Sequence, residues 1–265
     1  MQRIRDQQYL KEEQYKDSSN LDARVAIHQR FSTNLQGWYN WIFDELVKLP
    51  ADVKILELGC GPAYMWKECA DRIPEGWIIT LTDLSEGMLD SAWRNLVPLG
   101  RSFKFEQMGA QSISYNDETF DVVIANHMLY HVPDSKKALG EIKRTLKKDG
   151  ILFATTVGET HMQEMWKLLQ RASGGQQGLI DLSFTLENGK EQLQEFFSTI
   201  ELTRYTDNLR VTDLEIIMAY LQSMSSTQDL VEEQFSSIKN ELAEILKKSG
   251  EVFITKDSGM FKAIK

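Results

Sequence analysis

Val53-Lys-Ile-Leu-Glu-Leu-Gly-Cys-Gly61 is a short apolar run that ends in an acid and a Gly-x-Gly turn. The run predicts a buried parallel strand. The glycines allow a tight turn and let the backbone come close to a ligand, because no Cβ is in the way. The carboxylate of Glu57 would repel a pyrophosphate, but it would accept a ligand that has a ribose and a cationic end. We therefore expect such a ligand at the end of this strand.

A second apolar run, Trp77-Ile-Ile-Thr-Leu-Thr-Asp83, also ends in an acid. An acid at the end of the second strand, roughly 20 residues after the glycine turn, usually accepts ribose hydroxyl groups in nucleotide-binding folds. Between the two runs there is room for one crossover helix, and Ser85 is suited to cap the next helix. Two buried strands and a helix also occur in α/β domains without such a site, so this pattern alone does not identify the ligand.

Further strands are expected at 103–108, 120–126 and 151–156, with a helix at 138–146 that is followed by Gly150 as the residue after its C-terminus. The alternation of strands and helices predicts a doubly wound α/β fold with a mostly parallel sheet. Ligands of such sheets bind outside the carboxyl ends of the strands. That edge would bring together Gly59, Asp83, Ala110 and Asn126.

Four segments of this core resemble, in order and spacing, the motifs of the class I S-adenosylmethionine-dependent methyltransferases, in the small-molecule branch that includes the ubiquinone and menaquinone biosynthesis methyltransferases. The resemblance covers about residues 51–160. It implies a Rossmann-like methyltransferase fold, S-adenosylmethionine as cofactor, and in-line methyl transfer to a small molecule, for which no metal is required. The segments are Ile55-Leu-Glu-Leu-Gly-Cys-Gly61, Thr82-Asp-Leu-Ser-Glu-Gly-Met-Leu89, Phe120-Asp-Val-Val-Ile-Ala-Asn-His-Met-Leu-Tyr-His-Val-Pro-Asp134, and Leu139-Gly-Glu-Ile-Lys-Arg-Thr-Leu-Lys-Lys-Asp-Gly150 with Ile151-Leu-Phe-Ala-Thr155.

The resemblance also implies a set of cofactor-binding residues. Asp83 matches the family's ribose acceptor, and Asn126 would face the methionine portion of the cofactor. The family's usual acidic contact to the adenine amine is missing beside Ala110, so Gln111 or a backbone carbonyl would replace it. The full expected set is Glu57, Gly59, Gly61, Asp83, Leu84, Met88, Ala110, Gln111 and Asn126.

Two histidines, His127 and His131, follow the fourth strand. In related small-molecule methyltransferases, the histidine that ends this Leu-x-His motif can pair with a tyrosine of the N-terminal helix, and Tyr15 is a candidate here. We expect His131 and Tyr15 to be catalytic, with His131 as a general base whose unperturbed pKa of about 6.5 suits the task. A histidine that only packs is an equally good interpretation. The expected substrate-side residues are His28, His127 and Tyr130.

A metal ion is not expected at these histidines. They are four residues apart, but the Glu of an H-E-x-x-H motif is absent and no third ligand is evident. His161 is expected at the surface or at a helix start.

Residues 1–50 predict two helices that end at Pro50. In the resembled family such a segment often closes over cofactor and substrate, so we expect a lid. The alternative is a static cover of one sheet edge.

The C-terminal part, 161–265, predicts a strand at 200–205, helices at 212–224 and 229–248, and a hairpin formed by 251–256 and 260–265. A flexible link is expected at 173–178. The helices would be an insertion that covers the substrate, or they would only add core. The expected organisation is one methyltransferase domain, 1–265, with a lid (1–50), a cofactor-binding core (51–160) and C-terminal strands and substrate-cover helices (161–265).

The composition disfavours several classes of partner. A net charge of −9 argues against nucleic acid and anionic membrane surfaces, which need clustered Lys and Arg. There is no apolar run of 18 residues, and the first residues lack the apolar part of a secretory signal, so no membrane span and no export are expected. Cys60 and Cys69 have no CxxC spacing and are expected to be reduced thiols in a cytoplasmic protein. Nothing in the sequence indicates the oligomeric state.

Two other functions remain as alternatives. A binding or regulatory protein that keeps the cofactor pocket without turnover would carry the same motifs. A nicotinamide-dependent oxidoreductase is disfavoured, because Tyr64 occupies the position of the third glycine of a dinucleotide-binding motif. Methylation of nucleic-acid bases is disfavoured too, because Asn126 is followed by His127 and Met128 and not by Pro-Pro-aromatic.

Overall fold

A seven-stranded sheet forms the centre of the protein, whose computed structural model describes residues 3–175 and 182–265. The strand order is β3-β2-β1-β4-β5-β9-β6. Strands β1 to β5 run parallel, and β9 is antiparallel to both of its neighbours. The predicted doubly wound, mostly parallel α/β fold is thus confirmed. The strands are β1 (Lys54–Leu58), β2 (Ile78–Asp83), β3 (Lys104–Gln107), β4 (Phe120–Asn126), β5 (Leu146–Val157), β6 (Thr199–Tyr205) and β9 (Ser258–Ile264).

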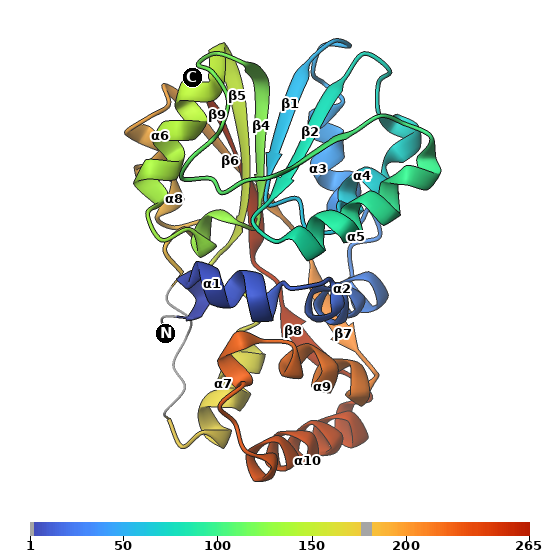
Figure 1. Ribbon diagram of the computed structural model, residues 1–265. Coiled ribbons are helices and arrows are strands. Elements are labelled where there is room, and N and C mark those ends of the chain that lie inside the picture. The colour runs from blue at the N-terminus through green and yellow to red at the C-terminus, as the bar shows by residue number, and fades with distance from the viewer. Residues whose placement is uncertain (1–2, 176–181) are drawn as a thin grey trace.

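Helices cover both faces of this sheet, because alternate strand residues point to opposite sides. Ile55 is buried against the layer of α3, α4 and α5, whereas its neighbour Leu56 is buried in the core that contains α6 and α8. Figure 1 shows the two helical layers on either side of the strands. Ser85 caps α5 as expected, because its Oγ accepts a hydrogen bond from the Met88 amide at 3.3 Å. The helices are α3 (Trp38–Leu46), α4 (Tyr64–Glu68), α5 (Glu86–Leu96), α6 (Ser135–Thr145) and α8 (Gly189–Gln194).

A second lobe lies beyond the carboxyl ends of the parallel strands (Figure 1). It has its own apolar core, in which Met165, Ile217 and Leu242 are buried. Helices α9 and α10 are the two helices predicted for this region, and α10 ends as expected at Gly250, which has φ +79°. The lobe consists of α7 (Gln163–Ala172), β7 (Asn208–Val211), α9 (Leu214–Gln222), α10 (Glu232–Ser249) and β8 (Val252–Thr255). The link expected at 173–178 lies partly outside the described residues.

The N-terminal segment divides into two parts, so the expectation of two helices is too simple. Helix α1, a π-helical turn and α2 lie between the sheet and the second lobe, and α2 packs against α9 (Figure 1). Helix α3 instead packs on the sheet, where Phe43 touches Trp66. Gly37, at φ +79°, turns the chain between the two parts. The N-terminal elements are α1 (Gln7–Tyr9), the π-helical turn (Leu10–Gln14) and α2 (Ser19–Phe31).

Short 3-10 turns connect several of these elements. Two of them border the carboxyl edge of the sheet: the first turn of the described chain and the turn that contains His131. These two contact each other, so the start of the chain reaches the loop after β4. The turns are Arg3–Arg5, Ala70–Arg72, Val97–Leu99, Leu129–His131 and Ser225–Thr227.

The expected helix end at Gly150 is wrong. Helix α6 ends at Thr145, and Gly150 lies inside β5, next to an irregularity in its pairing with β4. Asp149 has the left-handed φ of +62° there. A Cβ on Gly150 would come within 2.9 Å of the Lys147 carbonyl oxygen. The glycine is therefore required by a close approach within a strand and not by the end of a helix.

The hairpin expected near the C-terminus is also wrong. Strand β8 pairs with β7 in a separate two-stranded sheet, whereas β9 enters the main sheet between β5 and β6. The two strands separate because they bury different cores: Ile254 belongs to the second lobe and Phe261 to the main sheet. The chain crosses at Lys256, whose Nζ forms a buried ion pair with Asp207 at 2.6 Å.

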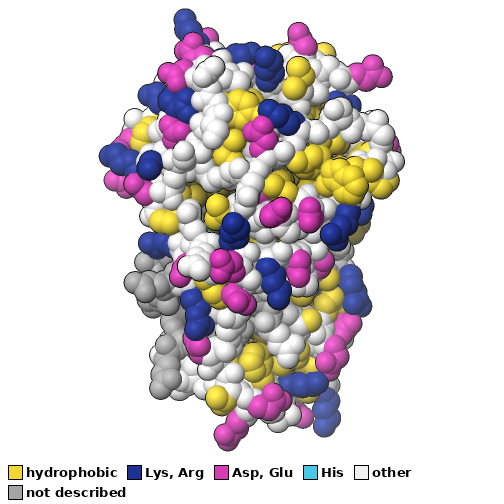
Figure 2. All heavy atoms as spheres, viewed as in Figure 1, with side chains coloured by type: hydrophobic (Ala, Val, Ile, Leu, Met, Phe, Trp, Pro, Cys, Tyr) yellow, Lys and Arg dark blue, Asp and Glu magenta, His cyan; other side chains and the backbone are white. Residues whose placement is uncertain are grey.

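Side chains of both charges are spread over the side of the surface that Figure 2 shows. Lys and Arg side chains alternate there with Asp and Glu, without a continuous basic patch. No helix within 3–175 or 182–265 combines the length and the apolar character that crossing a bilayer needs. Cys60 and Cys69 are buried free thiols.

Candidate active site

A cavity of about 720 Å³ lies at the carboxyl ends of β1, β2 and β4, between the sheet and the second lobe. It collects all four histidines of the chain, His28, His127, His131 and His161. Most of the other residues expected at the site also line it. They are Tyr15, Glu57, Gly59, Gly61, Asp83, Leu84, Met88, Ala110, Asn126 and Tyr130.

The side chain of Asp83, the last residue of β2, links the glycine turn to this strand by a hydrogen bond. Its Oδ2 accepts a hydrogen bond from the Gly61 amide at 2.9 Å, and its Oδ1 accepts one from the Ser85 amide at 2.8 Å. Burial raises the pKa of Asp83, although both hydrogen bonds favour the carboxylate. Gly59 has φ +66°, and a Cβ there would lie 2.9 Å from the Cβ of Met128. The turn is thus held close against the loop after β4, and each Asp83 oxygen keeps a second lone pair for a ligand hydroxyl.

Glu57 is only 3% exposed, and two side chains hold its carboxylate. Trp66 Nε1 donates to Oε2, and Asn126 Nδ2 donates to Oε1 at 2.9 Å. Burial raises the pKa of Glu57 to about 7, although both hydrogen bonds favour the charged form. The group is therefore close to half-ionised at neutral pH. A cation bound beside it would shift it to the carboxylate.

Tyr15 and His131 meet although they are far apart in the sequence. Tyr15 Oη lies 3.0 Å from His131 Nε2, and His131 Nδ1 lies 2.9 Å from the Ile4 carbonyl oxygen. A carbonyl oxygen can only accept, so Nδ1 carries the proton and Nε2 accepts from the Tyr15 hydroxyl. Burial lowers the pKa of His131 to about 4, below the unperturbed histidine value of about 6.5. His131 is neutral at pH 7, and its Nε2 is a hydrogen-bond acceptor.

The other three histidines are also neutral. Burial lowers the pKa of His127 and of His161 to about 3, and that of His28 well below its usual range. His161 lies just before α7, one of its two expected positions, but its ring faces the cavity instead of the surface. The only signal in the sequence was its place after the fifth strand, at the edge where ligands bind. Within the two described ranges, no group of three or more His, Cys, Asp or Glu side chains is arranged to hold a metal ion.

Apolar residues line the cavity beside Asp83, where the resemblance places the adenine. They are Leu84, Met88, Met108 and Ala110. Gln111 does not line the cavity. Its Oε1 accepts a hydrogen bond from Gln7 Nε2 at 3.3 Å, and Gln7 lines the cavity in its place.

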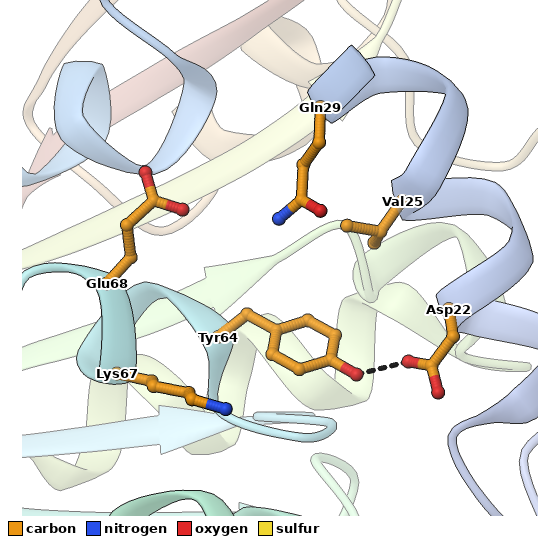
Figure 3. A pocket seen from close by; sticks show the side chains of 6 residues that line it. All are labelled: Asp22, Val25, Gln29, Tyr64, Lys67 and Glu68. Carbon is orange, nitrogen blue, oxygen red and sulfur yellow. Dashed lines mark hydrogen bonds between the residues drawn. The ribbon is translucent and has the colours of Figure 1, made fainter.

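A smaller hollow of about 540 Å³ adjoins the cavity between α2 and α4 (Figure 3). Tyr64, at the start of α4, points across this hollow and donates a hydrogen bond to Asp22 of α2. Burial, followed by the contact with Asp22, raises the pKa of Tyr64, so the phenol keeps its proton. This contact joins the N-terminal cover to the helix that follows the glycine turn. Sequence reasoning noted Tyr64 only for its bulk and missed the contact.

Known proteins resemble this chain most in the sheet. A protein-family model described as a methyltransferase domain matches residues 56–154. The ubiquinone biosynthesis O-methyltransferase of Pasteurella multocida is 25% identical over 177 residues, which cover 62% of this chain and 67% of that protein. The demethylmenaquinone methyltransferase of Lactobacillus johnsonii is 34% identical over 144 residues, which cover 51% of this chain and 58% of that protein. The chain thus spans between 58% and 67% of the length of these two relatives.

A solved structure resembles the chain over nearly its whole length. It is phosphoethanolamine N-methyltransferase 2 of Haemonchus contortus, in complex with phosphomonomethylethanolamine and S-adenosylhomocysteine. The TM-score is 0.61 at 19% identity, over 99% of this chain and 60% of that one. This likeness shows the fold. The cavity residues fit S-adenosylmethionine, because the site offers a carboxylate to a ribose, apolar walls to an adenine and a second acid to a cationic amino acid. Residues 56–154 thus match a methyltransferase domain, and in sequence the chain is similar to methyltransferases of ubiquinone and menaquinone biosynthesis.

Proposed function

We propose that this protein transfers the methyl group of S-adenosylmethionine to a small-molecule acceptor, and that Tyr15 and His131 take up the acceptor's proton. The observation that supports the proposal is the hydrogen bond between Tyr15 and His131. Both side chains line the same cavity as the glycine turn. Two relatives, a ubiquinone biosynthesis O-methyltransferase and a demethylmenaquinone methyltransferase, favour a small molecule over a macromolecule as the acceptor.

The sheet side of the cavity would hold the cofactor. Asp83 would accept the ribose hydroxyls, with the apolar wall of Leu84 and Met88 against the adenine. The glycine turn would allow the methionine portion to approach the backbone. Glu57 and Asn126 would face its ammonium group, and that positive charge would keep Glu57 ionised.

The second-lobe side of the cavity would hold the acceptor. The bound cofactor supplies an electrophilic methyl group on a positively charged sulfur. The cavity walls hold the acceptor in line with that methyl group and exclude water. As the acceptor forms its new bond, its proton passes to the Tyr15 oxygen while the Tyr15 proton moves to His131 Nε2. The Ile4 carbonyl stabilises the resulting imidazolium, because it accepts the hydrogen bond of Nδ1–H.

A protein that only binds the cofactor is less well supported. Such a protein needs the sheet side of the cavity, but it has no use for a half-buried tyrosine–histidine pair in which a backbone carbonyl fixes the tautomer of the histidine. Polar groups inside a protein that serve no purpose are costly to bury. The enclosed pair therefore favours turnover.

The proposal is tested by turnover and binding with the full chain. Protein and S-adenosylmethionine are incubated with a panel of phenols, carboxylic acids and amines, and S-adenosylhomocysteine is quantified by mass spectrometry. We expect acceptor-dependent product from at least one class, and much less product from the His131→Ala variant under the same conditions. Calorimetry that shows no affinity of the wild type for S-adenosylmethionine or S-adenosylhomocysteine would overturn the proposal.

A further inference from the structure

The cavity is electrically polarised. The acids that line it are Glu57, Glu68 and Asp83, and all three lie on the sheet or on α4 beside it. The basic side chains that line the cavity are Lys11 on the π-helical turn, Arg24 and Lys256, and Lys256 is already neutralised by its buried ion pair with Asp207. Among residues 3–175 and 182–265, no carboxylate forms an ion pair with Arg24, so its positive charge faces the cavity on the side of the second lobe.

The side chain of Arg24 has one hydrogen-bond donor that is not used within the described residues. Its Nε donates to the Asn20 carbonyl at 3.2 Å, and its guanidinium carbon lies 5.2 Å from the centroid of the Tyr15 ring. Its Nη2 is buried and has no hydrogen-bond partner among the described residues. A buried guanidinium nitrogen without a partner is unfavourable, because it has lost its hydrogen bonds to water and no protein hydrogen bond replaces them. A bound anion would satisfy it.

Two histidines line the same cavity as this arginine. His28 lies one helical turn after Arg24 on the same face of α2, and its Nδ1 is also buried without a partner among the described residues. The ring of His161 lies 6.3 Å from that of His28, between centroids. The Nδ1 of His161 accepts the Asp257 amide at 3.2 Å, so the proton of this neutral ring is on Nε2. His161 is thus a fixed hydrogen-bond donor next to His28, and it lines the same cavity as Arg24.

We propose that Arg24, His28 and His161 bind a carboxylate group of the methyl acceptor, an inference that rests on the proposed function. The planar guanidinium matches a carboxylate in shape as well as in charge. The aromatic walls around these residues suit a flat or apolar body attached to that carboxylate. A cationic acceptor is disfavoured, because it would lie against the positive charge of Arg24. The aromatic residues that line this side are Tyr130, Trp166 and Tyr220.

The test measures binding of three probes that share one ring and differ in charge: benzoate, benzamide and benzylamine. Each is titrated by calorimetry into the full chain saturated with S-adenosylhomocysteine. We expect benzoate to bind more tightly than benzamide, and benzylamine not to bind. Arg24→Gln is expected to weaken benzoate binding roughly 10- to 100-fold, because a charged hydrogen bond is lost. Arg30→Gln is the matched control, because Arg30 is on the same helix but pairs with Asp213 at the surface.

Two results would overturn the inference. The first is equal affinity for benzoate and benzamide, or no binding of benzoate to protein that binds S-adenosylhomocysteine. The second is a loss in Arg24→Gln of affinity for S-adenosylhomocysteine with no loss for 5′-methylthioadenosine, which has no carboxylate. That pattern would assign Arg24 to the cofactor.

Two further controls distinguish a loss of carboxylate binding from a loss of the fold and from a failure of the proposed function. Arg24→Lys, which retains the charge, should recover part of the benzoate affinity, and its melting temperature together with that of Arg24→Gln shows whether the fold is intact. A wild type that binds no S-adenosylhomocysteine contradicts the proposed function itself and not only this inference.

Discussion

On the sheet side of the cavity, most of the lining groups come from the short stretch 57–88, which one turn and two strand ends hold together. On the second-lobe side, Tyr15, His28, His161 and Tyr220 reach the cavity from separate parts of the chain. The first side is fixed by backbone hydrogen bonds such as Gly61 to Asp83. The second depends on side-chain contacts between elements that must first pack. A cofactor site can therefore be preserved while the acceptor site changes.

The largest effect is expected where the two sides cooperate. His131→Ala should lower kcat roughly 100- to 10,000-fold while leaving cofactor affinity nearly unchanged, because a general base acts only on the acceptor. Tyr15→Phe should share the defect, and the double variant should be little worse than either single one if the two act as a unit. Steady-state kinetics with the identified acceptor and calorimetry with S-adenosylhomocysteine provide the measurements.

The Tyr15–His131 pair also predicts how kcat depends on pH. His131 must be neutral to accept a proton, and burial lowers its pKa to about 4. The kcat of the wild type should therefore remain level as the pH falls from 8 and should decline only as it approaches 4. An acidic limb near pH 6.5 that vanishes in His131→Ala would show instead that the site is hydrated during turnover.

The next effect tests how rigid the sheet side is. Gly59→Ala introduces a Cβ 2.9 Å from Met128 at φ +66°, whereas Gly100→Ala has nearly the same φ, +65°, and no atom within 4 Å. Left-handed backbone costs a non-glycine residue about 1–2 kcal/mol, and overpacking adds roughly 1–3 kcal/mol. Urea unfolding should show the larger loss in Gly59→Ala, together with weakened S-adenosylhomocysteine binding. Equal losses of unfolding free energy in the two variants would mean that the loop after β4 moves to make room for the added Cβ.

Glu57 provides a test of the electrostatics on the sheet side. Its pKa in the folded protein is about 7, above the ordinary value of 4.5, so folding favours the protonated form. The wild type should lose stability as the pH rises from 4.5 through 7, by on the order of 3 kcal/mol. Glu57→Gln cannot titrate, so this part of the pH dependence should disappear from its urea unfolding curves. A Glu57→Gln curve parallel to the wild type across this range would place the titration elsewhere.

The smallest effect on stability is expected at the contact between Tyr64 and Asp22, which joins the two sides of the cavity. Tyr64→Phe removes the hydrogen bond to Asp22, which is worth about 1 kcal/mol. Hydrogen exchange in α2 should accelerate severalfold, and the slowing of exchange on cofactor binding should become weaker. Tyr115→Phe is the control, because Tyr115 bonds to Lys104 away from α2. Exchange in α2 that does not respond to cofactor in the wild type would support a static cover and not a lid.

The sequence was sufficient for the sheet side because its signals are local. The acid, the two glycines and Asp83 lie within about thirty residues, and their roles follow from strand ends and backbone freedom. The Tyr15–His131 contact was expected only through family resemblance. His161 was missed as a cavity group, because its position beside His28 depends on how the second lobe packs. The lowered pKa of His131 could not be predicted either, because the burial that causes it cannot be read from a residue's neighbours in sequence.

The errors at Gly150 and at β8–β9 have a common cause. A glycine after an apolar helix stripe and two apolar runs around Asp257-Ser-Gly259 are typical of a helix end and of a hairpin. Both local preferences gave way to burial, because β5 and β9 are central strands of the sheet.

The position of β9 has a consequence for synthesis on the ribosome. The strand completes the sheet between β5 and β6, yet it is made after every other strand. Until residues 258–264 emerge, β5 has an open edge and β6 has no partner, so the nascent chain exposes strands that could pair with other chains. Such long-range closure is slow. We therefore expect a chain lacking β9 to depend on chaperones, even though every residue of the glycine turn is already present.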